Sequence, residues 1–125
     1  MERNKSILGV FLLVLVILLT NCSKGEIGTN QKEILGTWIA VDKSDTLEFT
    51  SESDFNKSNG YIVSDHYDYE LFKDSIEIGY NGILYILVYQ TKHKYSIDNG
   101  NLTIDFSNKQ CYGFPLQEMT YIKEK

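Results

Sequence analysis

Beyond residue 22, apolar and polar residues alternate over short stretches, and turn-forming residues separate these stretches. No window there shows the 3.6-residue period of an amphipathic helix. The segment 94–106 is the clearest example, because Tyr95 and Ile97 fall on one face of a strand and Asn99-Gly100 then supplies a turn that tolerates positive φ. This periodicity predicts an all-β fold built from antiparallel hairpins.

About seven or eight short strands are expected, at a spacing of roughly ten residues. The expected strands cover residues 37–41, 46–50, 67–71, 75–78, 83–89, 94–97, 102–106 and 119–122, with one further short strand at 61–63. Residues 83–89 break the alternation because seven consecutive residues are apolar. We expect that strand to be covered on both faces, or to have one face in the core and the other against a partner or ligand. The pattern is typical of a sandwich or an up-and-down barrel.

The N-terminal segment has a different character. Arg3 and Lys5 precede an apolar run at 7–19, which ends in Leu19-Thr20-Asn21-Cys22. A basic segment followed by about a dozen apolar residues is typical of a secretory signal, whereas a membrane-spanning helix needs roughly twenty. The chain is therefore expected to leave the cytoplasm.

Leu19-Thr20-Asn21-Cys22 also resembles the lipobox of bacterial lipoproteins, although Asn21 stands where that family usually has a small residue. The resemblance implies a signal peptide over 1–21 and a Cys22 that carries acyl chains such as palmitate. Ser23 in place of Asp resembles the pattern of lipoproteins sorted to an outer membrane, on its periplasmic or its surface-exposed face. It thus implies a membrane partner, reached through the lipid anchor.

Without residues 1–21, about a hundred residues are left, enough for one domain. Residues 22–32 are polar and contain glycine, which predicts a flexible tether, and residues 33–125 form the domain. The formal net charge is −5, with acidic and basic residues interspersed, so nothing favours nucleic acid as a partner. Cys111 is left alone once Cys22 is acylated, so the fold must depend on its aromatic-rich core and not on a disulfide.

Gly36-Thr37-Trp38 opens the first expected strand and resembles the Gly-x-Trp motif of the lipocalins, and more closely the small lipocalin-like domains of bacterial lipoproteins. Over residues 35–123, the resemblance implies a meandering antiparallel barrel with an aromatic-rich interior, closed at its floor by Trp38. This domain is much shorter than a full lipocalin. The arginine that commonly packs on the tryptophan from the last strand has no counterpart near residues 121–123.

Few residues are candidates for metal binding or catalysis. His66 and Asp68 share one face of an expected strand while Asp65 faces the other way, and two ligands are too few for a metal site. His93 stands between two lysines and is expected to be exposed. Cys111 could act as a nucleophile if the fold brought His66 or His93 close to it. Cys111 has no flanking base or helix start to lower its pKa, however, and is more typical of a small buried residue. We expect no catalytic residue, no metal and no cofactor.

Aromatic residues raise the main question about function. The candidates to line an interior cavity are Trp38, Tyr69, Tyr85, Tyr89, Tyr95, Phe106 and Tyr121. One hypothesis is a lipid-anchored, non-enzymatic domain that binds a small apolar or sugar-like ligand in this cavity. The alternative is a structural or interaction lipoprotein, which includes an inhibitor of an exported enzyme, with a solid core and an exposed apolar strip at 83–89 for an envelope protein.

Overall fold

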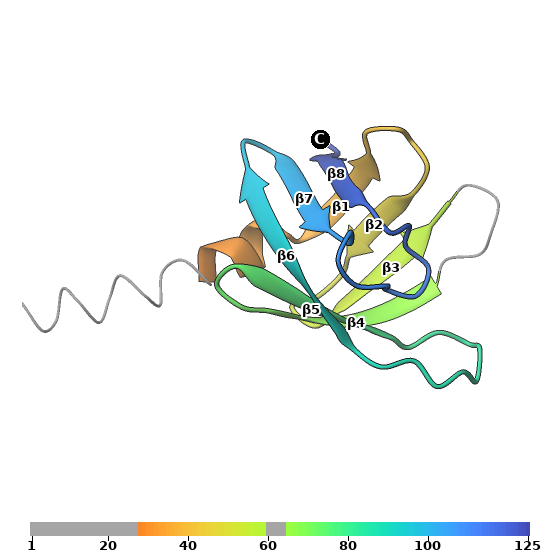
Figure 1. Cartoon of the computed structure of the whole chain (residues 1–125). Helices are drawn as coiled ribbons and strands as arrows, with labels where there is room; N and C mark the ends of the chain where they lie inside the picture. The colour runs from red at the N-terminus through yellow and green to blue at the C-terminus, as the bar shows by residue number, and fades with distance from the viewer. Residues whose placement is uncertain (1–27, 60–64) are drawn as a thin grey trace, which may run out of the picture.

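The computed structural model describes residues 28–59 and 65–125 of the chain. Its eight strands form a closed antiparallel barrel in which neighbours in sequence are neighbours in space, and the last strand pairs with the first (Figure 1). The strands are β1 (Gly36–Ala40), β2 (Thr46–Phe49), β3 (Asp54–Ser58), β4 (Asp65–Leu71), β5 (Ser75–Tyr80), β6 (Thr91–Asp98), β7 (Asn101–Asp105) and β8 (Glu118–Lys123). The all-β class and the meandering barrel are therefore confirmed.

A short helix at 28–33 precedes β1, although residues up to 32 were expected to be a flexible tether. The helix is held against the barrel, because Asn30 Nδ2 donates a hydrogen bond to the Tyr95 hydroxyl (3.0 Å) and Ile34, just after it, is fully buried. Six residues make fewer than two helical turns, too few for a 3.6-residue period to show in the sequence. Within the described ranges, no helix has the length and hydropathy needed to cross a bilayer.

The strand expected at 83–89 does not form. These residues belong to the long loop between β5 and β6, and most of their side chains are exposed. The ladder between the two strands ends at the pair Ile78–Thr91, and beyond it none of the described strands pairs with the segment. The expectation that this segment is covered by the fold was wrong, because an apolar run does not by itself create a partner strand.

β3 forms instead in a stretch that showed only polar character. Its inward-facing residues are Phe55 and Lys57, and Lys57 Nζ lies 3.8 Å from Asp45 Oδ2 and 5.2 Å from the ring centroid of Phe114. A lysine at an inward position hides the apolar alternation on which strand prediction depends. The strand expected at 61–63 lies outside the described residues.

Aromatic side chains fill the inside of the barrel. The largest fully buried ones are Trp38, Phe55, Tyr67, Phe106 and Tyr121. Phe106 stacks on Phe114 with ring centroids 4.4 Å apart, and Phe55 stacks on Tyr67 at 5.0 Å. These rings belong to one continuous hydrophobic cluster, so the described interior is a packed core.

The Gly-x-Trp motif begins β1. Gly36 has a φ of +117°, which L side chains rarely adopt, so glycine is required there. Trp38 is buried, and its Nε1 donates a hydrogen bond to the Ile34 carbonyl (2.7 Å). Lys123 of β8 places Nζ 5.4 Å from the Trp38 ring centroid. A cation from the last strand therefore does pack on the tryptophan. It is Lys123 and not an arginine, although no counterpart of that arginine was expected near residues 121–123.

Candidate functional site

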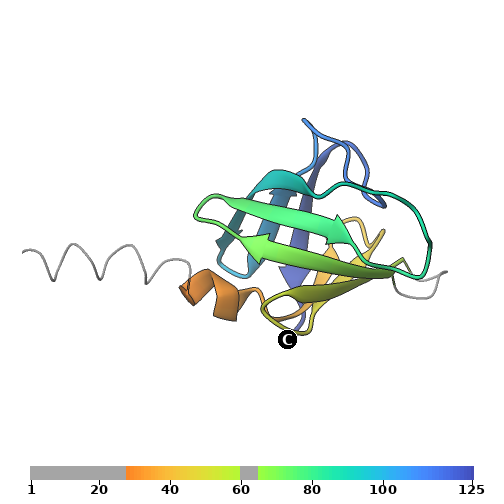
Figure 2. The ribbon, with the colours of Figure 1, turned by 90° about the horizontal axis from the view of Figure 1, so that it is seen from below.

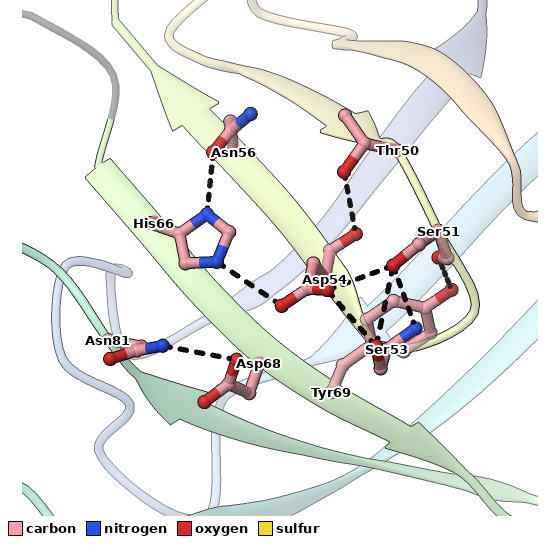
Figure 3. A network of polar contacts seen from close by, with 9 residues as sticks. All are labelled: Thr50, Ser51, Ser53, Asp54, Asn56, His66, Asp68, Tyr69 and Asn81. Carbon is pink, nitrogen blue, oxygen red and sulfur yellow. Dashed lines mark hydrogen bonds and ion pairs between the residues drawn. The ribbon is translucent and has the colours of Figure 1, made fainter.

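A polar cluster lies on the outer face of β3 and β4 (Figure 3). Strand alternation turns Asp54 and Asn56 outward on β3, and His66 and Asp68 outward on β4. The antiparallel register then places Asp54 opposite Asp68 and Asn56 opposite His66. The register of a single strand pair thus brings all four side chains together.

The imidazole of His66 is held from both sides by β3. Its Nδ1 lies 2.9 Å from Asn56 Oδ1, and its Nε2 lies 3.2 Å from Asp54 Oδ1. The other carboxylate oxygen of Asp54 accepts hydrogen bonds from the hydroxyls of Ser51 and Ser53, each 3.0 Å long. These serine hydroxyls hold the pKa of Asp54 below its usual value.

Asp68 completes a group of three that is able to hold a cation. Ligand atoms of Asp54, His66 and Asp68 lie within 4.8 Å of one another, and two carboxylates with one imidazole suit a divalent transition metal. Burial, together with the neighbouring Asp54 carboxyl, raises the pKa of Asp68. The sequence had paired only His66 with Asp68, because Asp54 comes from a strand that was not expected. All three side chains are partly exposed, and exposed acidic groups commonly cluster without a bound ion.

A second polar group lies inside the barrel, on β6. Thr91 and His93 point inward, and Thr91 Oγ1 lies 2.7 Å from His93 Nε2. His93 is buried against Phe106, with ring centroids 4.8 Å apart, so the expectation that it is exposed was wrong. The two flanking lysines point outward, because neighbours in a strand face opposite sides.

Thr91 also hydrogen-bonds with the thiol of Cys111, so it links this cysteine to His93. A cysteine near a histidine is the arrangement of thiol nucleophiles. Here, however, burial raises the pKa of Cys111 to about 11 and lowers the pKa of His93, whose ring also bonds to the backbone of Asp105. Both groups are therefore neutral at pH 7, and they form a satisfied buried network instead of a thiolate–imidazolium pair.

The aromatic cavity candidates divide into two sets. Five of them lie buried in the core: Trp38, Tyr69, Tyr95, Phe106 and Tyr121. The hydroxyl of Tyr69 donates to the carbonyl of Ser51 (2.7 Å) and that of Tyr95 to the carbonyl of Phe72 (3.3 Å), so both satisfy the backbone of the fold. Tyr85 and Tyr89 do not line the interior. They lie in the loop between β5 and β6 and are 106% and 78% exposed, because the strand expected to carry them does not form.

The third feature is the apolar loop, by which we mean residues 83–89. Its strongly exposed side chains are those of Ile83, Leu84, Tyr85, Ile86, Leu87 and Tyr89. Figures 1 and 2 place this loop at the opposite end of the barrel from the helix at 28–33. Comparison of the chain with protein-family models, with curated proteins and with solved structures found no match.

Proposed function

We propose that this chain is a lipid-anchored, non-enzymatic protein of the cell envelope, whose barrel is a rigid scaffold that presents the apolar loop to a protein partner. The observation that carries the proposal is a run of seven apolar residues, six of them exposed, on a domain whose described interior is already filled. Exposed apolar surface is unfavourable in water, and contiguous patches of it on soluble domains mark interaction sites.

The position of the loop supports a partner outside the anchoring bilayer. The anchor that we propose, acylated Cys22, precedes the helix at 28–33 by only a few residues of chain. The apolar loop lies at the far end of the barrel from that helix (Figure 2). An anchor on the helix side would direct the loop away from the membrane that holds the acyl chains. We propose that this membrane is the outer membrane.

Binding of a small apolar or sugar-like ligand inside the barrel has less support. The interior-facing rings pack on one another at centroid distances of 4.4–5.0 Å, as in Phe106 on Phe114 and Phe55 on Tyr67. A ligand in the same space would have to displace such contacts. Native mass spectrometry of the protein from its own host tests this function directly, since a retained small molecule would favour it.

Co-purification from host envelopes tests the protein-binding role. The loop variant carries Ile83→Ser, Leu87→Ser and Tyr89→Ser, and the matched control carries Val41→Ser, Leu116→Ser and Ile122→Ser, three exposed apolar residues elsewhere on the domain. We expect an envelope protein to co-purify with the wild type and the control but not with the loop variant. Equal recovery with the loop variant would contradict the proposal.

The anchor has its own test. A Cys22→Ala variant is expected to lose incorporation of labelled fatty acid and to leave the membrane fraction. Unchanged fractionation together with an unchanged mass would contradict lipidation at this residue.

A further inference from the structure

We infer that the partner of the apolar loop is a protein that surrounds an apolar pocket with basic residues. This inference rests on the proposed function and adds the chemistry of the partner. It follows from the charge of the barrel surface at the two ends of the loop.

The outer surface of β4 and β5 carries glutamates that form no ion pair in the part of the chain that the structure describes. Glu70 on β4 lies directly opposite Glu77 on β5, and like charges at such positions are destabilising. Lys92 on β6 lies opposite Glu77, but the Nζ of Lys92 packs over an aromatic ring, 3.9 Å from the ring centroid of Phe72. Among the described residues, neither glutamate forms an ion pair. A basic partner side chain would relieve this repulsion.

This acidic surface reaches the residues that flank the apolar loop. A pocket of about 170 Å³ holds these carboxylates beside the residue that follows the loop, and its lining residues are Ser53, Asp68, Tyr69, Glu70, Glu77 and Gln90. Gln90 follows the apolar loop and leads into β6. Before the loop, Asn81 Nδ2 donates to Asp68 Oδ1 (3.4 Å) and its backbone N–H to the His66 carbonyl (2.9 Å). The residues on both sides of the loop therefore lie near Asp68, and Gln90 lies near Glu70 and Glu77 as well.

The charge of the neighbouring barrel surface indicates which kind of partner the apolar loop can bind. Anionic lipid would be repelled by Asp68, Glu70 and Glu77, which share a pocket with Gln90 at the end of the loop, on a chain of formal net charge −5. A second copy in a symmetric contact would bring two such acidic surfaces together. A protein with lysine or arginine around an apolar pocket complements both parts of the surface, with the tyrosines of the loop as anchors.

Selection from a random peptide library tests the inference on the full-length protein in detergent, with the Ile83→Ser/Leu87→Ser/Tyr89→Ser variant as counter-selection. Loop-dependent peptides are expected to combine apolar residues with lysine or arginine. Glu70→Gln with Glu77→Gln should weaken their binding about fivefold. The matched control, Glu48→Gln with Glu118→Gln on the exposed faces of β2 and β8, should not change it.

The outcomes separate the inference from the function on which it rests. Loop-dependent peptides that are neutral or acidic, or that bind both glutamine variants equally well, would overturn the basic partner and leave the interaction role standing. Loop-dependent binding to phosphatidylcholine vesicles, or loop-dependent dimerisation, in place of peptide binding would also overturn it. If no selected peptide depends on the loop, the inference and the proposed function fail together.

Discussion

Replacing Thr91 by valine removes the centre of the buried network that joins Cys111 to His93. Valine keeps the shape of threonine but lacks the hydroxyl, which lies 2.7 Å from His93 Nε2. Thr91 and His93 are 8% and 3% exposed, so water cannot replace the lost hydrogen bond. A buried acceptor left unsatisfied costs about 1–3 kcal/mol, and the added methyl group offsets at most about 0.8 kcal/mol. We expect the free energy of unfolding to fall by about 1–2 kcal/mol.

Guanidinium unfolding at pH 7 measures this change as a lower midpoint at an unchanged slope. In a thermal melt, each kcal/mol corresponds to about 4–8 °C for a domain of this size. The control is Thr103→Val, the same chemical change on the outer face of β7, where Thr103 Oγ1 lies 3.4 Å from Thr120 Oγ1. It should stay within about 0.5 kcal/mol of the wild type. The reasoning is refuted if Thr91→Val is as stable as the control.

Three further predictions concern the same core and the start of β1. Burial lowers the pKa of His93 in the folded protein below its usual value of about 6.5. As the pH falls through about 6.5, the unfolded chain therefore binds more protons than the folded protein, and the free energy of unfolding should decrease. His93→Phe should make the free energy of unfolding less sensitive to pH between 7.5 and 5.5, and an unchanged pH dependence would contradict this. Cys111 is 3% exposed with a pKa of about 11, so iodoacetamide should label it only at the rate of local or global unfolding. Rapid labelling of the native protein would argue against the buried network. Gly36→Ala should cost about 1 kcal/mol or more, because φ there is +117°, while Gly28→Ala in the helix should not destabilise, and equal melting temperatures would contradict this difference.

Elements that depend on local sequence could be predicted. The hairpin of β6 and β7 turns at Asn99 and Gly100, with φ of 50° and 78°, as the Asn-Gly pair indicates. The inward positions of these strands, such as Tyr95 and Ile104, are buried as the alternation requires. The strands are short and most neighbours are joined by short turns, so the meandering barrel could be predicted from the sequence.

Features that depend on contacts between distant segments could not be predicted. Asp54 joins His66 only through the register of β3, and β3 was hidden by the inward Lys57. His93 was expected to be exposed because two lysines flank it, yet the strand face, and not its neighbours in sequence, decides its burial. The apolar run at 83–89 indicated a strand. A strand also needs a neighbour to pair with, and the pairing of β5 with β6 already ends at Ile78 and Thr91, which the sequence of the run does not reveal.

Site-specific photocrosslinking in the host cell tests the central claim that the apolar loop contacts a protein. The photoreactive residue p-benzoylphenylalanine is placed at Tyr85, which is fully exposed, and in a control at Lys73, in the exposed turn at the other end of β5. We predict a covalent adduct with one envelope protein from Tyr85 and none from Lys73, and the adduct should disappear when Ile83 and Leu87 are replaced by serine. The same adducts from both positions, or no protein adduct from Tyr85, would contradict the account.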